Sequence, residues 1–429
     1  MKHLLITCTI IASLTSCNSG NKVIISPIYI DSLIKNYNEA AAIKANDDDI
    51  RFWEQRIVHN TPQFLEPAKY AAALKARFSL LGDIADMKKA DSILYATAAA
   101  FNGKESSPYL SLSGHAITEH RFKDADSLLR LAKTIGIKKY ESFAASFDVD
   151  FELGRIRPAE YDLKGIYDPG NYGYQFRQSK MMHYKGDMDS SINAMQKAAD
   201  LAAADPSLRG IALSNVGDLY IHAGKPAKAY DCYRECIKLN SADMHSIMGI
   251  GWIALVHDKN DSLAEKIFLF VAGKTQTPDP LFKLVGAAEQ GSDTAKEMRY
   301  AKAFAEKASS EIYGTMYNKY LLQVYIGILN DPAAALAITQ KELTIRSTPQ
   351  TYAWYAWALV NNNKPDEAYK IYEQYISGKP LEGLELYWMG KMMQKLGKGY
   401  NAGEFFSEAK KSKYDLSPAE WKDLEISSE

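Results

Sequence analysis

The chain has 429 residues, of which 47% are hydrophobic and 24% charged, and 51 Lys and Arg nearly balance 52 Asp and Glu, for a net charge of −1. This composition is typical of a folded protein with a large core and argues against intrinsic disorder. Binding to a phosphate backbone through counterion release requires a basic face, and the overall charge shows no excess for one. We therefore expect no nucleic-acid partner.

The first residues have the pattern of a targeting segment. Lys2 supplies a positive charge, and the apolar run from Leu4 to Leu14 is too short to span a bilayer, which needs about 20 residues. The run ends in Leu14-Thr15-Ser16-Cys17, which resembles the lipobox of bacterial lipoproteins, where the signal peptide is cut before a cysteine that is then lipidated. The resemblance implies a signal peptide over 1–16 and a lipid, such as palmitate, on Cys17. An ordinary secretory signal with an unrelated cysteine is the alternative.

The residues after Cys17 form a short polar tether, which we place over 17–27. Asn18 stands where lipoproteins retained in the inner membrane of enteric bacteria carry Asp, and residues 19–22 lack the acidic run of some surface-exported lipoproteins. The resemblance therefore implies an anchor in the outer membrane, on its periplasmic face rather than on the cell surface.

Residues 213–240 have the pattern of a helix, a turn at Gly224 and a second helix, each with apolar residues at spacings of three and four. The pattern recurs from Tyr352 and again, 34 residues later, from Leu386. These repeats resemble the tetratricopeptide repeat family. A small residue early in each second helix, which lets the paired helices approach closely, traces weaker copies upstream: Ala90, Ala125, Ala159, Ser191, Ala229 and Ala264.

The resemblance implies an all-α fold, a right-handed α-solenoid of about ten helix-turn-helix units over 68–413. Residues 28–67 are predicted to form capping helices at the N-terminus. Residues 414–429 are predicted to form a C-terminal capping helix, because "SPAEWKDLE" from Ser417 places Pro in a first helical turn.

The common signatures of catalysis are absent from the sequence, so we expect a non-enzymatic protein without a cofactor or a metal site. "NDDDI" from Asn46 is interpreted as the start of a helix, and "DKNDS" from Asp258 as an inter-helix turn, because Leu263 and Leu269 stand where a calcium loop requires Gly and Glu. Cys232 and Cys236, four residues apart, are interpreted as small buried residues.

Solenoids of this kind bind partners on a concave surface lined by the first helices of successive units. Helical spacing and the geometry of the family place five candidate partner-binding residues on that side: Met248, Trp252, Trp357, Tyr387 and Lys391. An exposed tryptophan in this column is a natural hot spot, whereas packing between neighbouring helices is the alternative for both tryptophans.

Two further features bear on the ligand. The Lys and Asn clamp with which chaperone-binding members of the family grip a C-terminal carboxylate is missing, since Ser214, Asp218 and His222 stand in its place. "YDPGNYGYQF" from Tyr167 is either a sugar-stacking surface or a turn that enters a helix.

Together these features predict a non-enzymatic, lipid-anchored scaffold or adaptor. It would hold an envelope protein or peptide at the outer membrane, in an assembly, secretion or transport complex. A glycan- or peptide-binding lipoprotein of a nutrient-uptake system is the alternative. The sequence does not determine the oligomeric state.

Overall fold

The computed structural model describes residues 22–58, 61–397 and 399–428, and this part of the chain is helical with no strand. The predicted signal peptide and Cys17 lie outside the described residues. The first twelve α-helices are α1 (Pro27–Lys35), α2 (Ala40–Glu54), α3 (Leu65–Leu81), α4 (Ile84–Ala100), α5 (Ser106–Thr118), α6 (Phe122–Ile135), α7 (Lys139–Glu152), α8 (Ile156–Gly165), α9 (Tyr172–Tyr184), α10 (Met188–Leu201), α11 (Pro206–His222) and α12 (Pro226–Leu239).

The chain continues with α13 (Met244–Val256), α14 (Asp261–Ala272), α15 (Asp279–Gln290), α16 (Thr294–Ala308), α17 (Asn318–Gly327), α18 (Pro332–Ile345), α19 (Pro349–Asn361), α20 (Pro365–Ile371), α21 (Gly383–Leu396), α22 (Ala402–Ala409) and α23 (Pro418–Ser427). Short 3₁₀ helices span Glu311–Tyr313 and Lys410–Asp415, and a π-helical turn spans Tyr372–Ile376. Within the described residues, no helix is both long and apolar enough to cross a bilayer.

Local chemistry explains where the helices begin and end. Asp or Asn side chains cap the N-terminus of nine of the described helices, including Asp205 before α11 and Asn260 before α14, by accepting hydrogen bonds from free backbone amides. Gly224 (φ +69°) adopts the left-handed conformation between α11 and α12, as its predicted role in the turn requires.

Small residues allow the paired helices to approach closely. The six that trace the repeats in the sequence are fully buried, which confirms their expected role: Ala90, Ala125, Ala159, Ser191, Ala229 and Ala264. In the pair of α11 and α12, the first helix also contributes a small residue: a Cβ atom added to Gly217 in α11 would lie 2.5 Å from the ring of Tyr233 in α12. From α3 to α22 the described helices follow one another as ten such pairs, in agreement with the predicted α-solenoid.

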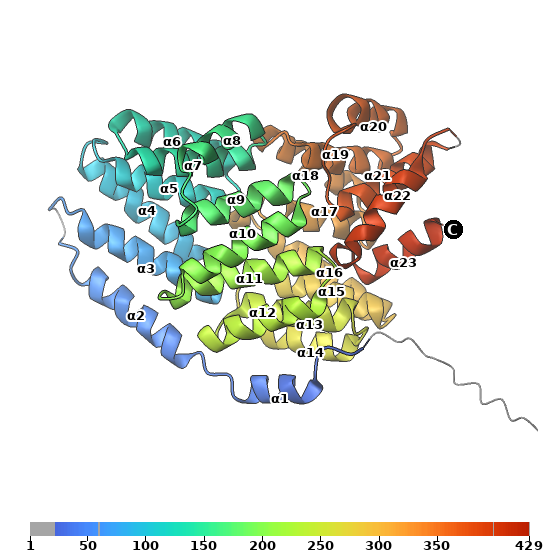
Figure 1. Cartoon of the computed structure of the whole chain (residues 1–429), viewed down its shortest axis with the longest axis horizontal. Helices are drawn as coiled ribbons and strands as arrows, with labels where there is room; N and C mark the ends of the chain where they lie inside the picture. Colours follow the sequence, from blue (N-terminus) through green and yellow to red (C-terminus); the bar gives the residue numbers. More distant parts are fainter. Residues whose placement is uncertain (1–21, 59–60, 398, 429) are drawn as a thin grey trace, which may run out of the picture.

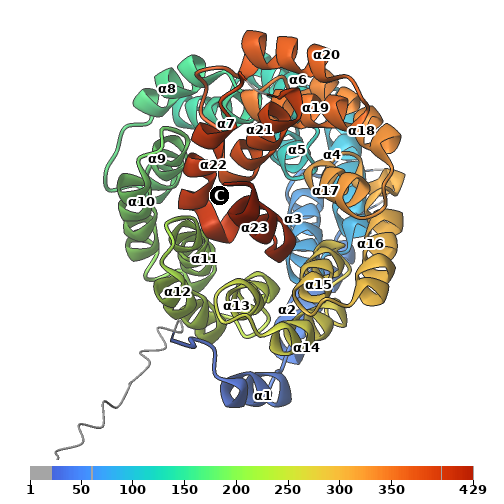
Figure 2. The same ribbon diagram turned by 90° about the vertical axis from the view of Figure 1, so that its right-hand side faces the viewer.

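The array winds into a ring whose second turn contacts its first (Figure 1 and Figure 2). The carbonyl of Leu81, the last residue of α3, accepts hydrogen bonds from the amide of Gln276 (2.7 Å) and the hydroxyl of Thr275 (3.1 Å). Further along, the carbonyl of His120 accepts from Thr315 Oγ1 (3.3 Å). Segments about 195 residues apart in the chain therefore close the ring.

The described end of the predicted tether is docked onto the solenoid. Ile25 is 1% exposed, and the amides of Ile24 and Ile25 donate to the carboxylate of Asp258 at 2.9 and 2.8 Å. Helix α1 then contacts α14, whereas α2 packs on α3, so the two helices expected to cap the N-terminus do not pair with each other. The "DKNDS" segment is an inter-helix turn, as expected, and it also receives this N-terminal segment.

Two other expectations have different outcomes. "NDDDI" does not begin a helix but lies inside α2, where Asn46 is buried and donates to the carbonyl of Ala73 (3.0 Å), and Asp48 pairs with Lys44 and Arg51. The helix predicted from Ser417 is present, with Ser417 and Glu420 forming a capping box. However, α23 does not extend the outer wall: it lies near the middle of the ring in Figure 2.

Candidate functional site

The inner face of the ring holds a cavity of about 670 Å³. Its walls come from α11, α13, α15, α17 and α21, which are the first helices of their pairs, and from the segment that runs through the 3₁₀ helix at 410–415 into α23. The first helices thus line the concave side, as the repeat architecture implies, and the C-terminal segment closes part of it.

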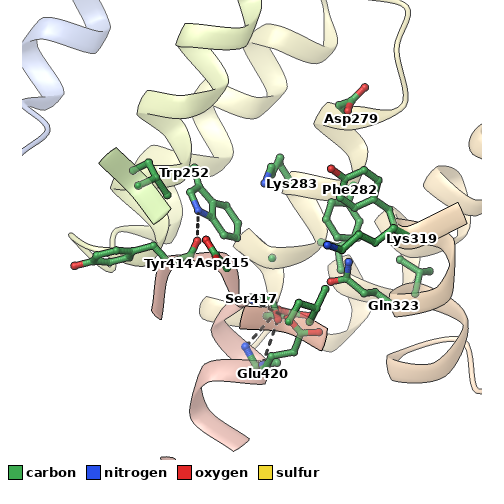
Figure 3. A pocket seen from close by; sticks show the side chains of 18 of the residues that line it. Trp252, Asp279, Phe282, Lys283, Lys319, Gln323, Tyr414, Asp415, Ser417 and Glu420 are labelled. Carbon is green, nitrogen blue, oxygen red and sulfur yellow. Dashed lines mark hydrogen bonds between the residues drawn. The ribbon is translucent and has the colours of Figure 1, made fainter. Parts of the chain in front are cut away.

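Trp252 and Met248, one turn apart on α13, both line this cavity. The indole Nε1 of Trp252 donates to the carbonyl of Tyr414 at 2.9 Å, and the ammonium of Lys283 lies 3.7 Å above its ring (Figure 3). Trp252 is half-buried and contacts both the C-terminal segment and the cavity.

Trp357 occupies the same column of its repeat as Trp252 but does not line the cavity, and its binding of a partner stays a prediction. It is 8% exposed, its ring lies parallel to that of Trp388 with centroids 6.4 Å apart, and it does not line the cavity. The reason is that α19 packs against α21 through this column, so packing between neighbouring helices, the alternative for both tryptophans, applies to this one.

Tyr387 and Lys391 on α21 contact α23. The hydroxyl of Tyr387 donates to Asp423 (2.7 Å), and the ammonium of Lys391 lies 2.8 Å from the same carboxylate and 3.2 Å from the hydroxyl of Ser427. Tyr387 lines the cavity while being largely buried. Asp423 and Ser427 of α23 thus engage both side chains, and partner binding by either residue stays a prediction.

The polar lining of the cavity is dominated by charged groups that the sequence analysis did not bring together. Eight carboxyl groups line it: Asp218, Asp279, Glu289, Glu297, Glu382, Asp415, Glu420 and Asp423. Four basic side chains accompany them: His222, His245, Lys283 and Lys319. The cavity therefore carries an excess of acidic groups although the whole chain is nearly neutral.

Several of these groups form ion pairs. His245 lies 3.0 Å from Asp218, whose charge raises the pKa of the imidazole to about 9, and His222 lies 2.6 Å from Asp415. Lys319 bridges Glu382 (3.2 Å) and Glu385 (2.9 Å). The charge of Lys319 holds the pKa of Glu382 well below its usual range. Asp218 is thus paired with His245, and His222 with Asp415. Asp218 and His222 stand where chaperone-binding members of the family carry the Lys and Asn clamp.

The remaining charged groups of the cavity have no ion pair within the described residues: Asp279, which accepts a hydrogen bond from Tyr317 (2.7 Å), and Lys283, Glu289, Glu297 and Glu420. Burial lowers the pKa of Lys283 to about 8. Burial, reinforced by the charge of Glu420, raises the pKa of Glu289 to about 8. Burial also raises the pKa of Glu420 to about 7, although Ser417 donates hydrogen bonds that oppose this shift. The cavity therefore holds groups of both signs that the fold leaves uncompensated.

The sequence offered little to identify these residues. Lys283, Gly286 and Glu289 recur at a spacing of three on α15, which places them on one side of the helix, but this unit has few consensus residues. Glu420 follows Glu289 by 131 residues, and only the course of the ring brings α23 beside α15.

No feature of the described residues indicates a metal site, since no three His, Cys, Asp or Glu side chains gather closely enough to hold an ion. Cys232 is half-buried and Cys236 is buried, and both are free thiols. Burial raises the pKa of the Cys232 thiol to about 11, in keeping with its interpretation as a structural residue. The aromatic turn from Tyr167 enters α9, where Asn171 accepts from the amide of Tyr174 (3.0 Å), which supports its interpretation as a helix-entering turn.

Comparison with known proteins identifies the repeat. Residues 212–243, which cover most of α11 and all of α12, match the family model described as tetratricopeptide repeat. No curated protein matches the chain as a relative.

Among solved structures, the chain is similar to Pseudomonas aeruginosa PilF (16% identity, 50% of this chain and 97% of that chain, TM-score 0.37). It is also similar to a tetratricopeptide repeat protein from Parabacteroides merdae (15% identity, 64% of this chain and 98% of that chain, TM-score 0.36). A third similar structure is yeast Tom70 (14% identity, 93% of this chain and 96% of that chain, TM-score 0.35). The match at 212–243 lies within a described part of the chain that is an all-helical solenoid of helix pairs, so this segment is similar to a tetratricopeptide repeat and its neighbours share the helix-pair architecture.

Proposed function

We propose that this protein is a non-enzymatic scaffold that binds a segment of a partner polypeptide in the cavity of its inner face. The observation that carries the proposal is the cavity itself, a space of about 670 Å³ that the first helices of five repeats surround. Its volume lies within the range of pockets that enclose a ligand of several residues or of drug-like size. Trp252 and Met248 offer apolar contact there, beside uncompensated charges that a partner can complement.

We further propose that a lipid on Cys17 anchors the scaffold to the outer membrane, on its periplasmic side, within an assembly, secretion or transport complex. The motif Leu14-Thr15-Ser16-Cys17 supports the anchor. Lys22 stands five positions after Cys17, a span of at most about 18 Å. His257 lies 3.3 Å from the carbonyl of Lys22 and 2.9 Å from the hydroxyl of Tyr414, so the anchored end would stand close to the segment that closes the cavity.

Photocrosslinking in native envelopes tests the partner. A photoreactive amino acid at Met248, which lines the cavity, is expected to capture a defined envelope protein. The same group at Tyr161, which is exposed on α8 and does not line the cavity, serves as the matched control. Equal adducts from both positions, or none from Met248, would contradict the proposal.

Membrane fractionation tests the anchor separately. Cys17→Ala is expected to move the protein from the membrane to the soluble fraction, since a chain without the acylated cysteine loses its lipid. Retention of the variant in the membrane fraction would exclude Cys17 as the point of attachment and leave the cavity proposal untouched.

A further inference from the structure

Three carboxyl groups without an ion pair line the cavity near the contact between α23 and α15. The carboxylate of Glu289, in the last turn of α15, accepts a 3.4 Å hydrogen bond from the amide of Ala419 in the first turn of α23. Glu420 follows directly and accepts from the amide of Ser417 at 2.9 Å. Glu297 of α16 lies near enough for its charge to raise the pKa of Glu289. Two helices thus hold like-charged groups together where their mutual repulsion costs stability.

No basic residue of the cavity forms an ion pair with Glu289, Glu297 or Glu420 within the described residues. Lys319 pairs with Glu382 and Glu385, and the ammonium of Lys283 lies over the ring of Trp252 (Figure 3). Lys283 is enclosed by protein and has no ion pair or hydrogen bond within the described residues, although it points into the cavity. The cavity wall therefore already accepts an alkylammonium group on an aromatic ring.

Apolar surface lies next to the carboxyl groups. A Cβ atom added to Gly286 would lie 3.7 Å from Pro418 and 3.9 Å from the ring of Trp252, so the indole edge and Pro418 approach the same point of α15. Carboxylates flanked by an aromatic ring suit lysine and arginine, because the long stem of these side chains packs on apolar surface while the charged end pairs.

We propose that the cavity binds a basic side chain of the partner, an arginine guanidinium or lysine ammonium, between the carboxyl groups of Glu289 and Glu420. This inference rests on the proposed function, because it names the chemistry by which the partner is recognised. An organic cation fits better than a metal ion, since within the described part of the chain no three metal-ligating side chains converge.

Binding of this kind is linked to protons. The charges of Glu420 and of Glu297 from α16 act on Glu289, and the charges of Lys319 from α17 and Glu385 from α21 act on Glu420. Their pKa values, raised to about 8 and about 7, leave both groups partly protonated near neutral pH. A bound cation favours their ionised forms, so affinity is expected to rise between about pH 6 and pH 8, and binding is expected to release protons.

Calorimetric titration of the full chain with capped peptides tests the inference. The probe is acetyl-Gly-Ser-Arg-Ser-Gly-amide, and its matched control carries citrulline, which has nearly the shape of arginine without the charge. At about pH 8 the arginine peptide is expected to bind at least about tenfold more tightly, the usual scale for hydrogen bonds to charged groups. Titrations in buffers of different ionisation enthalpy are expected to show proton release for the arginine peptide.

The double variant Glu289→Gln with Glu420→Gln is expected to lose the preference for arginine while remaining folded, because neutral amides of the same shape relieve the repulsion. Glu306→Gln, on the exposed side of α16, serves as the control and is expected to keep the preference. Circular dichroism and thermal unfolding establish that each variant is folded, and the single variants provide the comparison if the double one is not.

Equal binding of the two peptides, no binding of the arginine peptide, or a preference that survives the double substitution would overturn the inference. The outcomes also separate it from the proposed function. If the partner crosslinked at Met248 is captured equally by the wild type and the double variant, the cation site is wrong and the scaffold function stands. If no partner is captured and the arginine preference is still observed, the scaffold function fails and the cation site stands.

Discussion

The indole of Trp252 donates a 2.9 Å hydrogen bond to the backbone carbonyl of Tyr414, 162 residues further along the chain. This bond joins a first helix of the ring wall to the segment that closes the cavity (Figure 3). The inner face of this solenoid is thus partly occupied by its own C-terminus, and the shape of the cavity depends on how firmly that segment is held.

Replacement of Trp252 by Phe is expected to loosen the C-terminal segment. The variant keeps an aromatic ring but removes the donor, and leaving the Tyr414 carbonyl unpaired costs about 1 to 3 kcal/mol. Hydrogen exchange is expected to accelerate selectively over 410–428. Trp357→Phe, which alters a buried ring stack, is the control and is expected to lower stability without this selective effect. Unchanged exchange in the Trp252 variant would show that the bond does not hold the segment.

Two glycines of α11 are expected to respond in opposite directions to the same substitution. A Cβ atom at Gly217 would lie 2.5 Å from the buried ring of Tyr233, so Gly217→Ala is expected to destabilise the protein by about 1 to 3 kcal/mol. Gly210 has no neighbouring atom within 4 Å of its added Cβ, so Gly210→Ala is expected to stabilise the helix by about 0.5 to 1 kcal/mol. Chemical denaturation measures both, and equal effects would contradict the close helix contact at Gly217.

The raised pKa of Glu289 predicts a loss of stability with rising pH. Burial raises this pKa from an ordinary 4.5 to about 8, so the native state binds the proton more tightly than the unfolded chain does. The free energy of unfolding therefore falls as pH rises from about 4.5 to about 8 and stays reduced above it. Glu289→Gln is expected to match the wild type near pH 4.5 and to have a higher Tm near pH 9. A Tm difference independent of pH would contradict the shift.

The N-terminal segment is expected to depend on Asp258. Its carboxylate accepts hydrogen bonds from the amides of Ile24 and Ile25. Asp258→Ala leaves both donors unpaired, which is expected to lower the free energy of unfolding by about 1 to 3 kcal/mol. Limited trypsin digestion is expected to cut the variant faster at Lys35. Asp231→Ala, an exposed residue on α12, is the control and is expected to leave the cleavage rate unchanged. Equal rates in the two variants would show that the segment is held by packing alone.

The repeat pattern predicted the helix pairs because the contacts within a pair are local. Gly224 ends α11, and Ala229 at full burial lets α12 approach it, so both can be recognised from spacing alone. The position of Trp357 was not predictable in the same way. Trp252 and Trp357 occupy the same column of their repeats, yet one lines a cavity and the other stacks on Trp388, because the C-terminal segment contacts Trp252 whereas α21 of the next repeat packs on Trp357.

By itself, the sequence determined the helical repeats and the turns between them, because helix periodicity and capping act within a few residues. It also showed that the familiar catalytic signatures are absent from it. Only the tertiary structure decided that the array closes into a ring, that residues 22–26 dock on Asp258 and that α23 enters the interior. It alone brought Glu289 and Glu420 together. The small rotation from each repeat to the next accumulates over the whole array, and its sum, rather than any local pattern, sets which distant residues meet.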